Sequence, residues 1–233
     1  MNDFVLPAIP PATLAVQGSS SRFPIRRVFC VGRNYWWEAP VNGQRPARET
    51  PFFFMKPADT VVPAAGTIPF PPLTAEFCHE IELVVAIGKD GSDIASADAL
   101  DHVWGYAAGL DLTRRDQQML AKEYGRPWEG AKAFDASAPC GPLVPAAEIG
   151  HPQQGGVWLR VNGVERQRTD LAELIWPVAD IVSFISTSVT LRAGDLIFTG
   201  TPTGVGPLQP GDVVDAGIDG IGSLTMTVGP RAR

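Results

Sequence analysis

Two glutamates and one aspartate have the spacing that points most directly to chemistry. Glu80 and Glu82 lie two residues apart at the start of the apolar run 81–87, and Asp111 ends a second apolar run, 103–110. Successive side chains of a strand point to opposite faces, so the two glutamates share a face while the odd-numbered residues of the run face a core. Buried carboxylates need a partner, and three oxygen ligands suit a hard divalent cation. We therefore expect a metal site for Mg²⁺, with Mn²⁺ or Ca²⁺ as alternatives.

Each polar candidate also has an ordinary structural interpretation. The acidic strand face could be solvated, or its carboxylates could pair with Arg114 and Arg115. Lys132 lies among small and aromatic residues, where a lysine is either a surface residue with a buried stem or a cation that faces an anionic intermediate. Gln118 follows a helix start and could simply be a solvated helix residue.

A glycine-rich loop follows the apolar residues 195–198. It lacks the lysine of a phosphate-binding loop and the glycine spacing of a dinucleotide-binding turn. Its backbone N–H groups and the hydroxyl of Thr201 could instead donate hydrogen bonds to an organic carboxylate, and a plain turn is the alternative.

Several local patterns predict the elements that position these residues. Thr113 and Asp116 have the spacing of a helix cap, for a helix that ends near Glu123. The pair 162–163, Asn-Gly, predicts a hairpin, since both turn positions require positive φ. A short helix is expected to begin near Pro177.

Composition favours a single β-rich domain that acts on small molecules. The chain has 233 residues, 45% of them hydrophobic, and its 24 glycines and 22 prolines are spread along its length, as in folds with many short strands. A net charge of −6 argues against a nucleic-acid or membrane partner. The three cysteines are far apart and are expected to be buried, unpaired residues. No signal peptide or membrane span is evident, so we expect a cytoplasmic protein.

Six ordered motifs lie between about residue 25 and the C-terminus. They are Val31-Gly-Arg-Asn-Tyr35, Phe54-Met-Lys-Pro57, His79-Glu-Ile-Glu-Leu83, Gly109-Leu-Asp-Leu-Thr-Arg-Arg-Asp116, Lys132-Ala-Phe-Asp135 and Phe198-Thr-Gly-Thr-Pro-Thr-Gly-Val-Gly206. Together these motifs resemble the fumarylacetoacetate hydrolase family. Within that family, residues 113–116, 126–129 and 174–182 are most similar to the acylpyruvate hydrolase branch, which acts on fumarylpyruvate in gentisate catabolism.

The resemblance implies a β-rich α+β fold, a mixed β-roll with a few short helices, in a homodimer. Residues 1–24 would form an N-terminal segment and 25–233 a single catalytic domain. The resemblance also implies residue roles: metal ligands Glu80, Glu82 and Asp111; Lys132 and Gln118, supported by Arg115, as stabilisers of an enolate; and Arg33, Tyr35 and Thr201 in the substrate-holding loops. A 2,4-diketo acid could chelate the ion, whose charge favours enolate formation.

One position departs from the family pattern. Family hydrolases have a water-activating histidine four residues after the asparagine of the first motif and a glutamate three residues later, where this chain has Glu38 and Val41. Glu38 could act as the base if burial raised its pKa, or it could be an exposed loop acid. The loop 36–49 is polar, rich in turn residues and carries two tryptophans, so we expect it to close over a bound keto acid.

Three functions therefore remain open from the sequence. The first is metal-dependent hydrolysis of an acylpyruvate such as fumarylpyruvate. The second is decarboxylation or isomerisation of an oxaloacetate-type keto acid, which needs no activated water. The third is binding of keto acids without catalysis.

Overall fold

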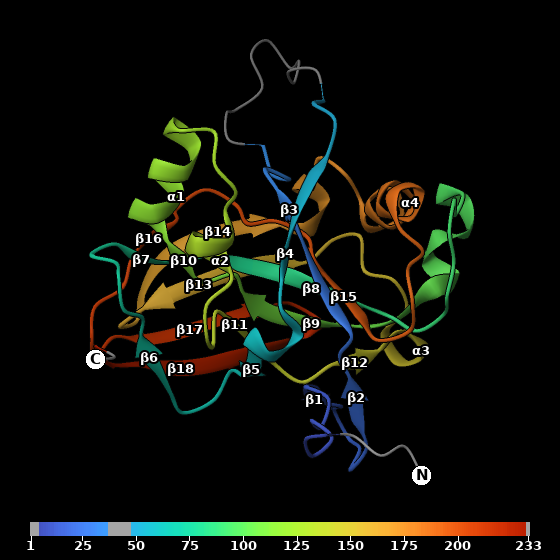
Figure 1. Ribbon diagram of the computed structural model, residues 1–233. Helices are drawn as coiled ribbons and strands as arrows, with labels where there is room; N and C mark the ends of the chain where they lie inside the picture. Colours follow the sequence, from blue (N-terminus) through green and yellow to red (C-terminus); the bar gives the residue numbers. More distant parts are fainter. Residues whose placement is uncertain (1–4, 37–47, 232–233) are drawn as a thin grey trace.

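Two β-sheets that pack face to face form the centre of the structure, a computed structural model that describes residues 5–36 and 48–231 (Figure 1). The larger sheet has the strand order β4-β3-β15-β8-β9-β11-β5, and β12 also pairs with β9. Most neighbouring strands are antiparallel, but β15 with β3 and β11 with β5 are parallel. Its strands are β3 (Arg27–Gly32), β4 (Phe52–Lys56), β5 (Val61–Pro63), β8 (Ile81–Ile87), β9 (Val103–Leu110), β11 (Ala138–Cys140), β12 (Val144–Pro145) and β15 (Asp195–Phe198).

The second sheet has five strands in the order β14-β13-β17-β18-β6, and two smaller sheets flank the pair. The five strands are β6 (Thr67–Phe70), β13 (Gly156–Val161), β14 (Val164–Asp170), β17 (Val213–Ile218) and β18 (Gly222–Arg231). The smaller sheets contain β10 (Thr113–Arg114), β7 (Phe77–His79) and β16 (Gly206–Pro207), and β1 (Thr13–Ala15) with β2 (Arg22–Pro24).

The helices are short and lie around the edges of the sheets (Figure 1). They are α1 (Arg115–Glu123), α2 (Glu129–Lys132), α3 (Ala146–Ile149) and α4 (Val178–Ser188), with 3₁₀ turns η1 (Ala58–Thr60), η2 (Ser96–His102) and η3 (Leu171–Glu173). No helix in the described residues is long and apolar enough to cross a membrane. The expected β-rich α+β fold, a mixed β-roll with a few short helices, is confirmed.

Two of the local predictions are confirmed. Asn162 (φ 52°) and Gly163 (φ 77°) form the turn between β13 and β14. Helix α4 begins directly after Pro177, whose fixed φ suits the residue that precedes a helix.

The predicted cap of α1 is wrong, although the helix ends at Glu123 as expected. Thr113 lies in β10, and its Oγ1 accepts a hydrogen bond from Lys132 at 2.6 Å. Asp116 is inside the helix, where its carboxylate accepts hydrogen bonds from the backbone N–H of Ala75 (2.9 Å) and from the Thr74 hydroxyl (2.6 Å). The cap pattern therefore marks two residues that serve tertiary contacts.

The larger sheet is buried on both faces, and β8 shows this most clearly. Its odd-numbered side chains, Ile81 to Ile87, pack into the main core between the two sheets. Val84 and Ala86 point the other way, into a second core with Leu14 and Phe23 from the N-terminal strands. Glu82, nearer the N-terminal end of β8, has the same alternation as Val84 and Ala86 and therefore lies on the same face of the sheet, beside that second core.

Candidate active site

The three acidic residues converge as their spacing predicts. Glu82 lies on β8, Glu80 directly precedes that strand, and Asp111 directly follows β9, its antiparallel neighbour. The backbone N–H of Asp111 donates to the Glu80 carbonyl at 2.9 Å, which fixes the two segments to each other. Each carboxylate offers an oxygen within 4.8 Å of the others, and all three side chains are buried.

These acids form the base of a cavity of about 610 Å³. They lie on the β8 face that carries Val84 and Ala86 further along, so the cavity begins where the second core ends. Aromatic side chains form much of its wall: Tyr35, Trp36, Phe52, Phe54, Trp128 and Trp176. A cavity of this size suits a small organic ligand.

Two buried lysines neutralise part of the acidic charge. The Lys132 ammonium donates to Glu80 Oε2 and Asp111 Oδ2, both at 2.7 Å, and to Thr113. Lys56 Nζ lies 2.9 Å from the other carboxylate oxygen of Asp111. Lys132 is 1% exposed, so its alternative interpretation as a surface residue is wrong.

The pKa directions follow from this arrangement. Burial raises the pKa of Glu82, and the negative charges of Asp111 and Glu80 raise it further. Burial also raises the pKa of Glu80. Burial acts on Asp111 in the same direction, but the ammoniums of Lys132 and Lys56 outweigh it and lower its pKa.

The site fits a divalent cation. Three carboxylates and two ammoniums leave the buried group one negative charge, and within the described residues no basic side chain lies within 4.0 Å of Glu82. Among the residues that the structure describes, the Glu82 carboxylate accepts one hydrogen bond, from the Gly200 N–H of the glycine-rich loop at 2.8 Å. An all-oxygen donor set with excess negative charge suits Mg²⁺ or Mn²⁺.

Gln118 and Tyr35 present polar atoms to the cavity. Arg115 Nη1 donates to Gln118 Oε1 at 2.7 Å, which leaves the Gln118 amide N–H groups as donors, and Gln118 is 3% exposed rather than solvated. The buried Tyr35 hydroxyl has no hydrogen-bond partner in the described part of the chain. Burial, and then the charge of Glu82, raises its pKa, so this hydroxyl is a donor available to a ligand.

The other expected site residues lie around these groups. Arg33 (φ 52°) and Thr201 line the cavity, and Thr201 Oγ1 accepts a hydrogen bond from Gln167 at 2.9 Å. Arg115 lies 4.0 Å from Glu80, at the limit of an ion pair, and Arg114 donates to the Gly130 carbonyl. The expected roles of Glu38 and of the loop 36–49 fall largely on residues 37–47, which lie outside the described residues.

Sequence reasoning missed three polar residues that build the site. Lys56 contacts Asp111 and the carbonyls of Leu112, Lys132 and Ser137. Asn34 binds the backbone of Trp176 through both its amide groups. Gln167 accepts from the Ile81 N–H and donates to Thr201, so it links the acidic strand to the glycine-rich loop. A lysine directly after four apolar residues was the one signal that could have indicated a buried cation.

The fold and this centre define an enzyme with a buried carboxylate site for a divalent metal at the base of an organic-ligand cavity. Residues 27–229 match the family described as fumarylacetoacetate (FAA) hydrolase C-terminal. The chain belongs to the fumarylacetoacetate hydrolase family, which includes metal-dependent hydrolases.

Individual relatives are similar over most of their length. A fumarylpyruvate hydrolase from Ralstonia sp is 41% identical over 182 residues, which is 78% of this chain and 94% of that protein. A mitochondrial oxaloacetate tautomerase from Homo sapiens is 41% identical over 204 residues, which is 87% of this chain and 91% of that protein. A crystal structure of fumarylpyruvate hydrolase from Pseudomonas aeruginosa, in complex with Mn²⁺ and pyruvate, has 50% identity and a TM-score of 0.93, covering 98% of this chain and 100% of that one.

Proposed function

We propose that this protein hydrolyses a carbon–carbon bond of an acylpyruvate, with fumarylpyruvate as the substrate and fumarate and pyruvate as the products, in gentisate catabolism. The observation that carries the proposal is the set of three buried carboxylates at the base of a 610 Å³ cavity. The 50% identity to a fumarylpyruvate hydrolase in complex with Mn²⁺ and pyruvate supports this choice of substrate.

The proposed roles follow from the contacts. Glu80, Glu82 and Asp111 hold Mg²⁺ or Mn²⁺. The ion supplies positive charge that polarises a keto acid and favours its enolate. Lys132 keeps two of the ligand carboxylates in place and adds positive charge beside them. Gln118, with Arg115 behind it, is the donor to a developing enolate oxygen.

The remaining groups hold and orient the substrate. The Tyr35 and Thr201 hydroxyls line the cavity together with Arg33, and these groups suit the oxygens of a keto acid. Hydrolysis also needs a base that activates water. Glu38 is our proposal for that base, and it stays a prediction from the sequence.

A second candidate is tautomerisation or decarboxylation of oxaloacetate. The 41% identity to the human oxaloacetate tautomerase favours it, as does the presence of Glu38 where family hydrolases have histidine. Neither reaction needs an activated water. Binding of keto acids without turnover is the third possibility that the test below addresses.

The test is a comparison of turnover on fumarylpyruvate and oxaloacetate with Mg²⁺ or Mn²⁺. We expect stoichiometric fumarate and pyruvate from fumarylpyruvate, and loss of this activity in Glu82→Gln. Glu165→Gln is the matched control, because Glu165 is an exposed strand residue that pairs with Arg168. Turnover of oxaloacetate alone would favour the second candidate, and no turnover of either compound would favour the third.

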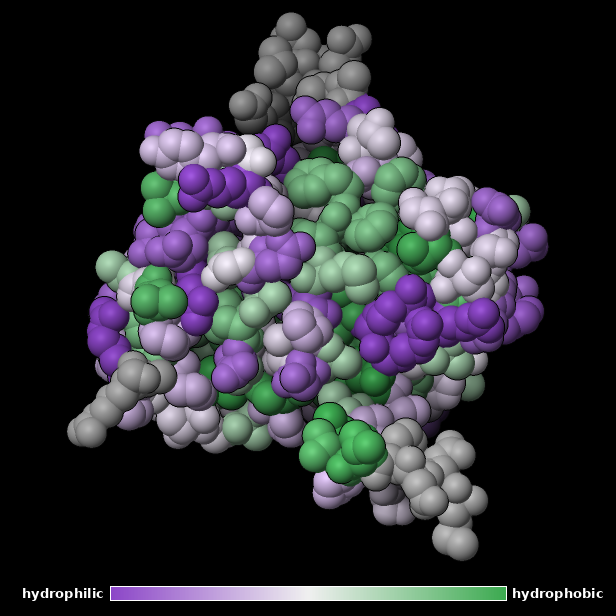
Figure 2. Space-filling view, viewed as in Figure 1, coloured by the Kyte–Doolittle hydropathy of each residue, from purple (hydrophilic) through white to green (hydrophobic). Residues whose placement is uncertain are grey.

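The proposal also covers the subunit number and the cellular location of the protein. We propose a cytoplasmic homodimer. Apolar side chains gather near the centre of the face shown in Figure 2, where β4 runs in Figure 1, and Phe52 and Met55 of β4 are each 38% exposed. An exposed apolar group of this kind supports a subunit contact. Light scattering on the purified protein measures the subunit number.

A further inference from the structure

The outer part of the cavity carries the opposite charge to its base. The base holds the three acids with Lys132 and, 4.0 Å from Glu80, Arg115, whereas the remaining lining includes one acidic side chain, Glu49, and three basic ones: Arg33, Arg48 and Lys122. The whole lining contains five basic and four acidic residues, a net charge of +1, and a divalent ion at the base would raise the net charge of the cavity to +3. A cavity with this charge favours a ligand with more than one negative group.

Helix α1 connects the base with the outer part. Arg115, Gln118 and Lys122 are spaced by three and four residues, which places them on one face of the helix. Arg115 lies 4.0 Å from Glu80, at the base end. Since an α-helix rises 1.5 Å per residue, Lys122 lies about 10 Å further along the axis than Arg115.

The ammonium of Lys122 has an aromatic neighbour. It lies 5.0 Å from the centre of the Trp128 ring. Within residues 5–36 and 48–231, no carboxylate lies within 4.0 Å of Lys122 or Arg33. Partial burial, and then the positive charges of Arg115 and Arg33, lower the pKa of Lys122. These cations repel one another, and a bound anion would relieve that repulsion.

We propose that Lys122, together with Arg33, forms a second anion subsite that binds the distal carboxylate of a keto dicarboxylate. The inference rests on the proposed function because it assumes that the keto-acid end is held at the acidic base. An extended seven-carbon diketo diacid separates its two carboxyl carbons by about 7 Å, at roughly 1.2 Å per bond, and the long Lys122 side chain covers the remaining distance.

The walls between the two ends suit a flat, unsaturated ligand. The Phe52 and Phe54 rings lie 5.7 and 5.6 Å from the Trp128 ring, centre to centre, and all three residues line the cavity. Aromatic faces pack against planar conjugated chains with little loss of conformational entropy. The subsite therefore selects unsaturated dicarboxylates over acylpyruvates that end in a methyl group.

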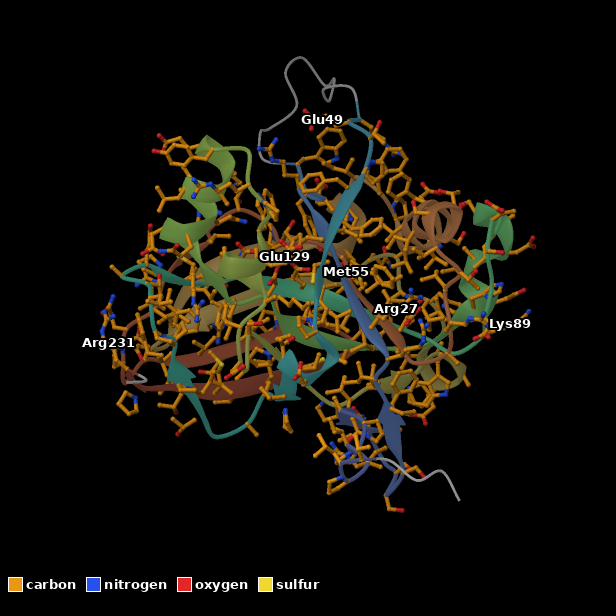
Figure 3. The ribbon with its side chains drawn as sticks, viewed as in Figure 1. Arg27, Glu49, Met55, Lys89, Glu129 and Arg231 are labelled. Atoms are coloured by element: carbon orange, nitrogen blue, oxygen red, sulfur yellow. The ribbon has the colours of Figure 1, made fainter. Side chains whose placement is uncertain are left out.

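The experiment compares two unreactive seven-carbon probes that differ only at the distal end, 2-oxoheptanedioate and 2-oxoheptanoate, by calorimetry with Mn²⁺ present. We expect the wild type to bind the dicarboxylate more tightly than the monocarboxylate. Lys122→Met should reduce this preference, the Kd of the monocarboxylate divided by that of the dicarboxylate, by about fivefold, as for a partly exposed ion pair. Lys122→Arg should retain most of the ratio. Lys89→Met, a matched control at the far edge of the molecule (Figure 3), should leave it unchanged.

Two results would overturn the subsite: equal affinity of the wild type for the two probes, or an unaltered ratio in Lys122→Met. These results are independent of turnover. A wild type that hydrolyses no acylpyruvate but retains a ratio dependent on Lys122 would refute the proposed function and support the subsite. Hydrolysis of fumarylpyruvate by the wild type, together with an unaltered Kd ratio in Lys122→Met, would support the proposed function and refute the subsite.

Discussion

Replacing Lys132 with methionine tests whether a buried ammonium and a divalent ion neutralise the same carboxylates. Lys132 donates to Glu80 and Asp111 at 2.7 Å each, and removal of one partner from a buried ion pair costs about 3–5 kcal/mol. Asp111 keeps Lys56 at 2.9 Å, whereas Glu80 keeps Arg115 at 4.0 Å. We therefore expect Lys132→Met to lower the free energy of unfolding of the metal-free protein by about 3–4 kcal/mol.

A bound ion should reverse much of this loss, because it brings positive charge to the same oxygens. With saturating Mn²⁺ we expect a loss of about 1–2 kcal/mol. By thermodynamic linkage, the difference of about 2 kcal/mol must appear as Mn²⁺ binding that is roughly 30-fold tighter in the variant. The variant would thus be less stable and yet have the higher metal affinity.

The assay is urea unfolding at pH 7, followed by tryptophan fluorescence with chelator or with Mn²⁺, and an independent calorimetric Mn²⁺ titration. The folded state holds the pKa of Lys132 above its ordinary value of 10.5. Its stabilising contribution is therefore complete below pH 10.5 and is lost only as the pH rises through the raised pKa. Lys89→Met is the surface control. An equal loss of stability with and without Mn²⁺ would refute the shared-carboxylate reasoning.

Two further predictions concern residues away from the acids. Burial acts to raise the pKa of Asp116, but hydrogen bonds from Thr74 and backbone N–H groups outweigh it, so the group stabilises the fold above its ordinary pKa of 3.8. Asp116→Asn should cost about 1 kcal/mol at pH 7, and the difference in urea unfolding should shrink as the pH falls below 3.8; a constant difference would exclude the carboxylate as its source. In Gly105→Ala the new Cβ would lie 2.3 Å from the Val144 carbonyl oxygen, so we expect a loss of about 3 kcal/mol in thermal or urea unfolding. Gly130→Ala, with nothing within 4 Å of its Cβ, should gain up to about 1 kcal/mol, and equal effects of the two would contradict the steric reasoning.

The acidic centre could be predicted because it depends on rules local to two strands. The alternation of β8 places Glu80 and Glu82 on one side, and an apolar run that ends at Asp111 matches β9 to its last residue. The alternation of side chains along a strand does not predict which strand pairs with which, or in what register. That pairing sets Ile81 opposite Leu110 and so brings Asp111 beside the Glu80 backbone.

The failed helix cap and the missed Lys56 have one physical cause. Both depend on partners that are distant in the sequence: Asp116 binds residues 74 and 75, and Lys56 binds carbonyls at 112 and 137. Local propensity favours a Thr-x-x-Asp cap by about 1 kcal/mol. A buried ammonium that needs three acceptors outweighs this, so Thr113 serves Lys132 instead.

The same contacts explain how one chain keeps three carboxylates together before any ion binds. Lys56 approaches Asp111 from one side and Lys132 from the other, and both lysines are buried, so neither charge is screened by solvent. In the described part of the chain, the Glu82 carboxylate accepts a hydrogen bond only from the Gly200 N–H, and burial raises its pKa well above the ordinary value. The electrostatic cost of the site is thus greatest at Glu82, and a divalent ion held by the three carboxylates would offset it. The same cavity is lined by Gln118 and by Tyr35, whose hydroxyl has no hydrogen-bond partner among the described residues.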